Sequence, residues 1–486
     1  MLFNSYIFIL FFLPLNLFLY FGLNRIGKEW LAKVILIGMS LWFYAYFHVV
    51  YLVIIVFSVL LNYCISKVIL KLQQNSIRKV FLWIGLLSNI SVIFYFKYFN
   101  FFLDNIELIS SWEFETRQIL LPLGISFFTF QQISYLVDSY KKETEKYTFI
   151  DYFLFVTFFP QLVAGPIVLH EEMLPQFNEK KRKIFSHEYF AKGVYLFAMG
   201  LFKKVMIADV LGKGVDWGFA NYQVLTGLEA VIVSLLYTLQ IYFDFSGYCD
   251  MAMGIANMFH IDLPLNFNSP YKAVSILDFW QRWHISLTRF LRKYIYFPLG
   301  GSRKGLPRTL INVIIVFLVS GIWHGAAWTF VLWGLLHGLA NAFCRLFKKT
   351  WERVPKILAW LCTFVFLDLT WILFRAESTR QAGHILKTIF SPWEMRVSES
   401  LLNCFDLLEF TYVEEHIQVL GNLIEQMPYL HLLIVVILAL AIALIPKNNH
   451  EKEFKPSVWN GMLTVMLMIW GVFSLSGLST FLYFNF

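Results

Sequence analysis

One histidine stands in a place where an ionisable side chain needs a reason. His324 lies in the stretch Ser320-Gly-Ile-Trp-His-Gly-Ala-Ala-Trp328, close to the middle of the uncharged run of residues 309–344. Ionisable groups inside membrane-spanning segments are energetically unfavourable and usually serve a function. An apolar setting favours the neutral imidazole, which can take a proton from a hydroxyl or thiol nucleophile. We therefore expect His324 to act as a general base; the alternative is a core histidine that a neighbouring group satisfies.

A second histidine, His284, follows a tryptophan in Trp280-Gln-Arg-Trp-His284, where an imidazole gains little from packing. Three basic residues of the same region, Arg282, Arg289 and Lys293, fall on one stripe at helical spacing. A helix with such a basic face would lie at the membrane interface and suit an anionic ligand with phosphate groups. The alternative is an anchor that binds lipid head groups. We expect His284 to orient the ligand or to stabilise charge that develops on it.

Two carboxylates, Asp244 and Asp250, lie among aromatic residues in Tyr242-Phe-Asp-Phe-Ser-Gly-Tyr-Cys-Asp250. Paired carboxylates can carry out acid–base chemistry or bind a cation. The interpretation that we favour is structural: the two side chains cap a broken helix and anchor a neighbouring Arg or Lys. The five cysteines are scattered without metal-binding spacing, so we expect no metal site.

The elements that must position these residues are helices in a bilayer. Hydrophobic residues make up 58% of the chain and charged residues only 15%, against about 25% charged residues in soluble proteins. Runs without Asp, Glu, Lys or Arg cover residues 5–23, 34–66, 80–96, 118–137, 152–170, 309–344, 427–446 and 456–486. Since one crossing needs roughly 20 apolar residues, we expect an all-α polytopic membrane protein with about 11 to 13 membrane helices.

The charge pattern indicates how these helices are oriented. The net charge is +8, and Lys and Arg gather in clusters such as Lys180 to Lys183. The positive-inside rule places such clusters at the cytoplasmic face, which explains the positive charge without a nucleic-acid partner. Between Lys387 and Lys447 the only basic residue is Arg396, so we expect an external loop at about residues 390–426.

Several short motifs follow one another along the chain. They are Met1-Leu-Phe-Asn-Ser-Tyr6, Leu121-Pro-Leu-Gly-Ile-Ser-Phe-Phe-Thr-Phe-Gln131, Phe159-Pro-Gln-Leu-Val-Ala-Gly-Pro166, Tyr242-Phe-Asp-Phe-Ser-Gly247, Phe279-Trp-Gln-Arg-Trp-His284, Tyr296-Phe-Pro-Leu-Gly-Gly301 and Gly321-Ile-Trp-His-Gly325. With these motifs in this order the chain resembles the membrane-bound O-acyltransferase (MBOAT) family, specifically the bacterial branch that O-acetylates exported polysaccharides such as alginate. The resemblance implies a single MBOAT domain over residues 1–486, with a core at 118–345 and C-terminal helices at 427–486.

The resemblance also implies how the site is built. It predicts many helices around a central tunnel, with His324 at its narrow point and His284 on the cytoplasmic side. Acetyl-CoA is the implied acyl donor, used as a substrate and held by the basic face, with no permanently bound cofactor. The implied acceptor is an exported cell-surface polysaccharide, and a separate extracytoplasmic acetyltransferase of the SGNH-hydrolase type completes the transfer. The implied location is the bacterial cytoplasmic (inner) membrane, with many passes through the lipid bilayer.

The C-terminal stretch Leu478-Ser-Thr-Phe-Leu-Tyr-Phe-Asn-Phe486 is aromatic and resembles the ends of acetylating family members. The sharper hypothesis for it is that the Tyr483 hydroxyl accepts the acyl group beside His324 and passes it to the external partner. Interfacial packing is the alternative, because Tyr and Trp favour the membrane boundary.

Other functions stay open at this point. Within the family, D-alanyl transfer to teichoic acid from a carrier-protein thioester would use the same two histidines. A non-enzymatic transporter or flippase would account for the intramembrane polar residues Asp244, Asp250 and Asn312, although the halves of the chain show no inverted repeat of the kind common in transporters. The length of the chain and the charged segment at 390–426 resemble the acetylating branch better.

Overall fold

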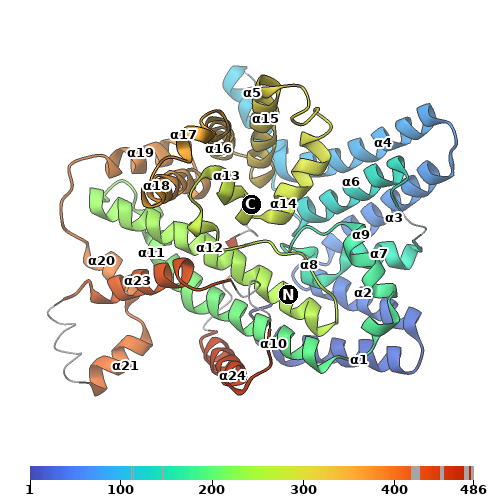
Figure 1. Ribbon diagram of the computed structural model, residues 1–486, viewed down its shortest axis with the longest axis horizontal. Helices are drawn as coiled ribbons and strands as arrows, with labels where there is room; N and C mark the ends of the chain where they lie inside the picture. Colours follow the sequence, from blue (N-terminus) through green and yellow to red (C-terminus); the bar gives the residue numbers. More distant parts are fainter. Residues whose placement is uncertain are drawn as a thin grey trace. The chain divides into compact units, whose positions relative to one another are not determined.

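The computed structural model describes residues 1–110, 112, 114–115, 117–144, 147–417, 427–448, 454–475 and 481–482. All regular elements in these residues are helices, and no strand occurs among them (Figure 1). The expectation of an all-α protein is therefore confirmed.

Six helices in the described residues are long and apolar enough to cross a membrane. They are Phe8–Arg25, Val50–Lys71, Asn75–Ile109, Gly227–Met258, Leu306–His324 and Lys356–Arg375, and two shorter apolar helices cover Leu430–Leu444 and Val458–Phe473. The chain is thus a multi-pass membrane protein. The sequence-based count of about 11 to 13 crossings is larger, because it includes apolar runs that fold into shorter helices. The exact number of crossings stays a prediction.

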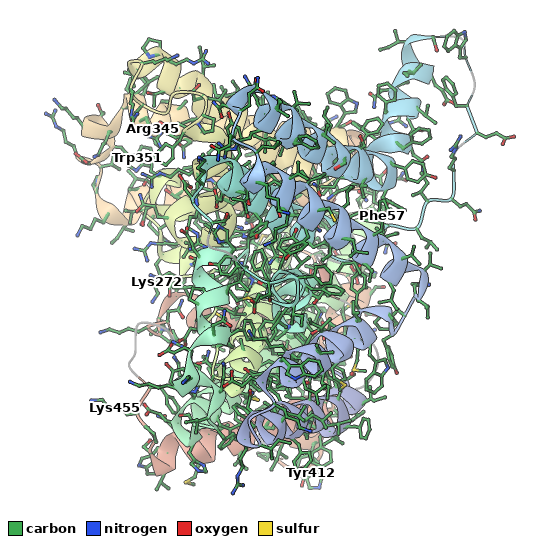
Figure 2. The ribbon with its side chains drawn as sticks, turned by 90° about the vertical axis from the view of Figure 1, so that its right-hand side faces the viewer. Phe57, Lys272, Arg345, Trp351, Tyr412 and Lys455 are labelled. Carbon is green, nitrogen blue, oxygen red and sulfur yellow. The ribbon has the colours of Figure 1, made fainter. Side chains whose placement is uncertain are left out.

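Apolar side chains cover the outward faces of these helices. On α3 (Val50–Lys71), Phe57 is 64% exposed and Val53, one turn earlier, is 70% exposed (Figure 2). On α4 (Asn75–Ile93), Trp83 and Leu87 are exposed in the same way. Contiguous exposed apolar surface of this kind is rare in soluble proteins and is the expected covering where the solvent is lipid.

The chain divides into two compact units that alternate along the sequence. The first contains Met1–Leu201, Tyr248–Leu265 and Phe454–Phe486, and the second contains Phe202–Gly247 and Asn266–Glu453. The long helix α12 (Gly227–Met258) contributes to both units. The single domain expected over residues 1–486 stays a prediction.

The first unit packs the N-terminal helices with the C-terminal part of α12. Its other helices are α1 (Leu13–Arg25), α2 (Glu29–Ala45), α3, α4, α5 (Phe99–Ile109), α6 (Ile125–Lys141), α7 (Phe149–Thr157), α8 (Phe159–Leu162), α9 (His170–Asn178), α10 (His187–Phe202) and α24 (Val458–Phe473). Helix α10 approaches α12 closely, since a Cβ added to Gly193 would lie 2.6 Å from the Gly254 carbonyl oxygen. Small residues at such crossings let helix backbones touch within a membrane.

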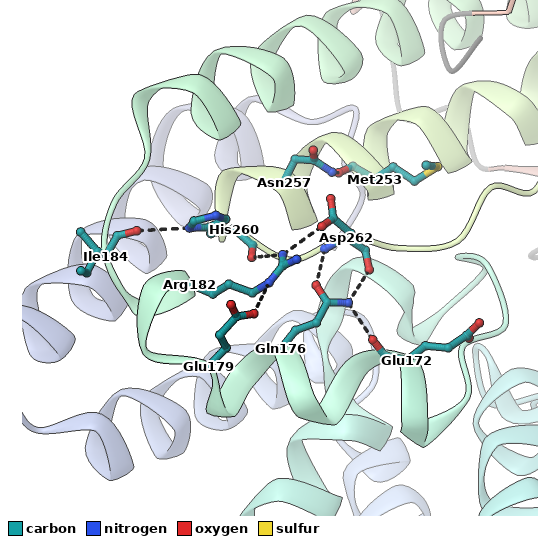
Figure 3. A network of polar contacts seen from close by, with 9 residues as sticks. All are labelled: Glu172, Gln176, Glu179, Arg182, Ile184, Met253, Asn257, His260 and Asp262. Carbon is teal, nitrogen blue, oxygen red and sulfur yellow. Dashed lines mark hydrogen bonds and ion pairs between the residues drawn. The ribbon is translucent and has the colours of Figure 1, made fainter. Parts of the chain in front are cut away.

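A network of polar contacts surrounds the residues that follow the C-terminal end of α12 in the first unit (Figure 3). The Arg182 guanidinium donates to the Asp262 carboxylate (2.9 Å) and to the His260 carbonyl oxygen (3.0 Å). The Asp262 N–H donates to the side-chain oxygen of Gln176 on α9 (2.8 Å). Arg182 also pairs with Glu179 at 3.0 Å. Part of the basic cluster at residues 180–183 is therefore neutralised by acidic neighbours.

The second unit carries both candidate histidines. Besides α12 its helices are α11 (Asp209–Ala220), α13 (Ile276–Arg282), α14 (Ile285–Leu291), α15 (Leu306–His324), α16 (Trp328–Leu346), α17 (Lys348–Trp351), α18 (Lys356–Arg375), α19 (Thr379–Ile389), α20 (Glu399–Leu402), α21 (Leu408–His416) and α23 (Leu430–Leu444). A π-helical turn at Lys203–Ala208 precedes α11, and another at Arg292–Tyr296 follows α14.

The uncharged run at residues 309–344 folds into two closely packed helices, α15 and α16, with a short break between them. A Cβ added to Gly321 on α15 would lie 2.3 Å from the Phe330 carbonyl oxygen. One added to Gly334 on α16 would lie 2.5 Å from the Phe317 carbonyl oxygen. The two glycines therefore let the helix backbones touch, as small residues do at helix crossings in membranes.

The segment expected as an external loop at residues 390–426 contains helices in its described part. Residues up to 417 include α20 and α21, and residues 418–426 lie outside the described residues. The Ser398 N–H before α20 donates to the Glu229 carboxylate on α12 (2.8 Å), which ties the segment to the second unit. The side of the membrane on which it lies stays a prediction.

Candidate active site

The two candidate histidines come together in the second unit. The ring centroids of His284 and His324 are 6.3 Å apart, and both side chains are buried, with exposures of 0% and 2%. They come from different elements, since His284 lies between α13 and α14 and His324 ends α15. The structure therefore joins two residues that are well separated in the sequence.

His284 lies at a sharp turn between two short helices. Helix α13 ends at Arg282, and α14 begins at Ile285. Between them His284 has the left-handed conformation, with φ 46° and ψ 52°, which costs a non-glycine residue about 1–2 kcal/mol. The Asn266 carbonyl oxygen accepts from the Ile285 N–H (3.0 Å) and so holds the turn.

This turn corrects the expected basic stripe. The sequence predicts Arg282, Arg289 and Lys293 on one face of a single helix, but the turn at His284 separates Arg282 from the other two. The physical reason is the left-handed residue, which interrupts the regular helical register. Arg289 on α14 and Lys293 in the following π-helical turn are both half-buried.

Arg282 already has an acidic neighbour. Its Nε–H donates to the Asp278 carboxylate (2.7 Å), one helical turn earlier, and its Nη1 donates to the Asn268 carbonyl oxygen (3.4 Å). Sequence reasoning missed this ion pair, although an acidic residue four positions before a basic one on a helix is a signal for it. The charge of Arg282 is therefore partly neutralised within the protein.

The side chain of His284 contacts Asn266. Its Nδ1 lies 3.2 Å from the Asn266 side-chain oxygen, which also accepts from the Ser286 N–H (3.2 Å) and the Ser286 hydroxyl (2.8 Å). Complete burial lowers the pKa of His284 to about 3, so the imidazole is neutral near pH 7. Sequence reasoning did not identify Asn266, because its place in Leu265-Asn-Phe-Asn-Ser269 has no spacing that is typical of a site.

His324 is the last residue of α15. The following Gly325 is extended, with φ −163° and ψ 153°, so the chain leaves the helix directly after the histidine. The sequence places His324 near the middle of an apolar run, and the structure places it at the break between the two helices of that run. Irregular backbone in a membrane protein is tolerated where it is buried in protein or lines a cavity, and broken helices often form substrate sites.

Aromatic rings enclose the two histidines. Trp333 and Phe374 contact the His324 ring edge-on, at centroid distances of 5.3 and 5.0 Å. Phe245 on α12 makes the same kind of contact with His284, at 4.9 Å. This lining makes the site apolar, which strengthens electrostatic interactions that form within it.

His337, in the middle of α16, has a different environment. The Trp280 Nε1–H donates to His337 Nδ1 (3.3 Å), and His337 Nε2 lies 3.1 Å from the Thr370 hydroxyl oxygen. The side chain thus links α16 to α13 and α18. These contacts are consistent with the expected role of His337 in helix packing.

The buried carboxylate of Asp244 anchors a lysine. Lys204 Nζ lies 2.7 Å from the Asp244 carboxylate and 2.7 Å from the Asp209 carboxylate. The expected anchoring role is confirmed for Asp244. The expected break in the helix is wrong, because α12 is continuous from Gly227 to Met258. Asp250 lies six residues further along the same helix, in the part that belongs to the first unit, and its expected role stays a prediction.

Two other polar residues singled out in the sequence have different outcomes. Asn312 on α15 is explained by structure, since its amide donates to the carbonyl oxygens of Leu299 (3.3 Å) and Gly301 (2.9 Å) and so ties the loop before α15. Tyr483 lies outside the described residues, so its expected relay role stays a prediction.

Comparisons with known proteins cover most of the chain. The model of the membrane-bound O-acyltransferase family, MBOAT, matches residues 36–377, which include both histidines. A peptidoglycan O-acetyltransferase of Helicobacter pylori is 46% identical over 417 residues, which cover 80% of this chain and 79% of that protein. The probable alginate O-acetylase AlgI of Pseudomonas aeruginosa is 38% identical over 409 residues, which cover 82% of this chain and 76% of that protein. A teichoic acid D-alanyltransferase of Bacillus subtilis is 28% identical over 279 residues, which cover 52% of this chain and 69% of that protein.

Proposed function

Because the chain belongs to the membrane-bound O-acyltransferase family, in the branch of the polysaccharide O-acetyltransferases, we propose that it supplies acetyl groups for the O-acetylation of peptidoglycan. We propose peptidoglycan as the acceptor because the chain is 46% identical, over 80% of its length, to a peptidoglycan O-acetyltransferase. Identity to an alginate O-acetylase is lower, at 38%. The acyltransferase class follows from the family itself. The bacterial cytoplasmic membrane is the proposed location.

In the proposed reaction His324 is the general base. Its neutral imidazole takes the proton of an acceptor hydroxyl while the hydroxyl oxygen attacks the carbonyl carbon of the acetyl thioester. The carbon–sulfur bond then breaks and the proton passes to the leaving thiolate, which gives an acetyl ester and a free thiol. General acid–base catalysis of this kind contributes about 10²–10⁴ in rate. The 6.3 Å between the ring centroids of His324 and His284 supports a reacting group that both side chains contact.

The aromatic enclosure supports this chemistry. Trp333 and Phe374 pack edge-on against His324, and this apolar lining disfavours bulk water near the imidazole. A dry site protects a thioester and an acyl intermediate from hydrolysis and strengthens the interactions that stabilise developing charge.

For the donor we propose acetyl-CoA, which approaches from the cytoplasmic side. Arg289 and Lys293 are the proposed phosphate-binding residues, because they are four residues apart, half-buried and close in the chain to His284. Cationic side chains form strong charge-assisted hydrogen bonds with phosphate. Arg282 is the third candidate, and its Nε–H also donates to Asp278 at 2.7 Å. The donor is a substrate in this scheme, and no resident cofactor takes part.

The acceptor polysaccharide lies outside the cell, so the proposed pathway needs a second step. An extracytoplasmic acetyltransferase of the SGNH-hydrolase type would take the acetyl group and deliver it to sugar hydroxyls. The Tyr483 hydroxyl is the proposed relay between His324 and this partner. In that case the first acetyl ester forms on Tyr483, and a Tyr483→Phe variant should release no acetyl group to the partner.

The alternatives have less support. The D-alanyltransferase relative is 28% identical and matches 52% of the chain, whereas the two acetyl-transferring relatives match 80% and 82%. A transporter is disfavoured because the family consists of acyltransferases. The buried Asp244, part of the argument for transport, is accounted for by its ion pair with Lys204 at 2.7 Å.

A donor assay tests the chemistry. The purified protein in lipid nanodiscs is incubated with acetyl-CoA that carries a radiolabelled acetyl group, and release of CoA is followed. We expect turnover by the wild type and by His384→Ala, which changes an exposed histidine on α19. Turnover only with a D-alanyl carrier protein would overturn the choice of donor.

Analysis of cell-wall fragments tests the acceptor. Muropeptides from cells with and without the protein are compared by mass spectrometry. We expect O-acetylated sugars to be lost together with the protein and restored by the wild-type chain. Unchanged muropeptides with loss of acetyl groups from another surface polymer would contradict the peptidoglycan assignment.

A further inference from the structure

We propose that Asn266 is a positioning residue that fixes His284 as the neutral tautomer with its proton on Nδ1, so that Nε2 acts as a hydrogen-bond acceptor. The catalytic meaning of this inference rests on the proposed function, but its geometry does not. The observation that carries it is the set of contacts around the side-chain oxygen of Asn266.

The orientation of the Asn266 amide follows from Ser286. The Ser286 backbone N–H can only donate, and it lies 3.2 Å from the Asn266 side-chain atom that also contacts His284. That atom must therefore be the oxygen, because the amide nitrogen has no lone pair with which to accept. The Ser286 hydroxyl, at 2.8 Å, donates to the same oxygen.

The orientation of the amide decides the tautomer of His284. The Asn266 oxygen can only accept, so the His284 Nδ1 that lies 3.2 Å from it must carry a proton and donate. Burial lowers the pKa of His284 to about 3, so the ring has one proton rather than two. Nε2 then has only a lone pair. Such an atom can accept a hydrogen bond from an amide, hydroxyl or thiol of the substrate, but it cannot donate to a developing oxyanion.

The backbone around Asn266 supports the same role. Its carbonyl oxygen accepts from the Ile285 N–H (3.0 Å), while its side chain contacts His284 and Ser286. Asn266 thus contacts both the backbone of the left-handed turn at His284, where φ is 46°, and the imidazole of His284. These two contacts restrain the imidazole, because the turn that carries His284 and its ring both bond to the same residue.

His337 provides an internal contrast for the tautomer. The Trp280 Nε1–H can only donate, so the His337 Nδ1 that lies 3.3 Å from it must accept. The proton of His337 is therefore on Nε2, which lies 3.1 Å from the Thr370 hydroxyl oxygen. The Thr370 hydroxyl proton is directed to the Phe366 carbonyl oxygen (2.9 Å), which leaves Oγ1 to accept. The two buried histidines thus have opposite tautomers.

Nitrogen NMR measures these tautomers directly. The full-length protein is labelled with ¹⁵N-histidine in nanodiscs, and the signals of His284 and His337 are assigned by difference from His284→Phe and His337→Leu. We expect a protonated Nδ1 and an unprotonated Nε2 for His284, and the reverse for His337. A proton on Nε2 of His284 near pH 7 would overturn the inference, and this result does not depend on any variant of Asn266.

Two substitutions of Asn266 then separate positioning from general stability. Asn266→Leu removes the acceptor, and we expect loss of the Nδ1–H tautomer and about a 10- to 100-fold fall in kcat, the size of effect seen when a metal-binding histidine loses its orienting partner. Asn266→Asp keeps an acceptor oxygen, so it should keep the tautomer and recover most of that loss. Asn257→Ala, which removes a buried amide in the first unit that donates to the Met253 carbonyl oxygen (2.8 Å), is the control for stability. Equal activity and equal spectra for Asn266→Leu and the wild type would contradict the proposal.

The NMR and activity results also separate this inference from the proposed function. If the wild type has the expected tautomer but does not release CoA from acetyl-CoA, the function fails and the positioning geometry stands. If the wild type turns over acetyl-CoA but His284 is protonated on Nε2, the function stands and the inference fails.

Discussion

His324 and His337 lie in the same apolar run, yet their surroundings differ. His337 is in the middle of α16, and both of its ring nitrogens contact groups on neighbouring helices, Trp280 on α13 and Thr370 on α18. His324 is the last residue of α15, beside a break in the helix, and its ring lies 6.3 Å from that of His284. Apolar surroundings alone therefore do not distinguish the two histidines. We expect a place at a helix break, next to a second buried histidine, to be the more informative feature of a catalytic residue.

The largest expected effect comes from His324. We expect His324→Ala to lower the rate of CoA release by about 10²–10⁴, because the variant lacks the proposed general base. Its unfolding temperature should fall as well, since the variant loses the buried contacts of the ring with Trp333 and Phe374, so rates are compared per folded molecule. Initial rates with acetyl-CoA check the first expectation, and thermal unfolding in nanodiscs checks the second. A rate within threefold of the wild type would remove His324 from the mechanism.

The next effect concerns stability rather than rate. His337→Leu leaves the Trp280 indole N–H without its acceptor and removes the contact with Thr370. A buried donor that loses its partner costs about 1–3 kcal/mol, so we expect a lower unfolding temperature. Molecules that remain folded should turn over at near the wild-type rate. A folded but inactive His337→Leu protein would break the distinction between the two histidines.

A pH effect on stability is expected from His284. Its folded-state pKa is lowered to about 3 from 6.5, so between these values the unfolded chain binds a proton that the folded chain does not. The stability from this residue is therefore complete above about pH 6.5 and falls as the pH falls, by up to about 2 kcal/mol at pH 5. His324 is a titratable residue that faces His284, and Asn266, Phe245 and Trp323 are neutral neighbours.

Comparison with a variant isolates this pH effect from that of the other histidines. Unfolding temperatures of the wild type and of His284→Gln are measured at pH 7 and pH 5. We expect the wild type to lose more stability than the variant over this interval. The same loss in both proteins would show that His284 is already protonated or already exposed.

The smallest expected effect concerns donor binding. Arg289→Gln combined with Lys293→Gln should raise KM for acetyl-CoA by about 3- to 10-fold, because partly exposed charge pairs contribute only modestly. Arg282→Gln should change KM less, because it removes one positive charge where the double variant removes two. Steady-state kinetics at two salt concentrations check both, because salt screens exposed charges. A larger KM effect for Arg282→Gln than for the double variant would reverse this ranking.

Much of the architecture could be predicted from the sequence. Long uncharged runs predict helices in lipid, and six helices of the described residues are long and apolar enough to cross a membrane. The anchoring role of Asp244 also follows from the rule that a buried carboxylate needs a cationic partner. These predictions succeed because hydrophobic length acts locally along the chain and a buried charge needs a partner wherever in the chain that partner lies.

The details of the site could not be predicted in the same way. The left-handed turn at His284 has no sequence signal of the kind that glycine provides, so Arg282 was expected on the same helix as Arg289 and Lys293. The contact between His284 and Asn266 depends on a turn that forms only when α13 and α14 fold. Contacts of this kind arise from tertiary structure, and a single sequence does not encode them in its spacing.

We propose that the two histidines of the apolar run differ in role, with His324 in the chemistry and His337 in packing. The most direct test is kcat per folded molecule, measured with saturating acetyl-CoA for His324→Ala and His337→Leu in the same nanodisc preparation. We expect a fall of about 10²–10⁴ for His324→Ala and a change of less than about threefold for His337→Leu. Equal falls for the two folded variants, or near-normal turnover by His324→Ala, would contradict this difference in role.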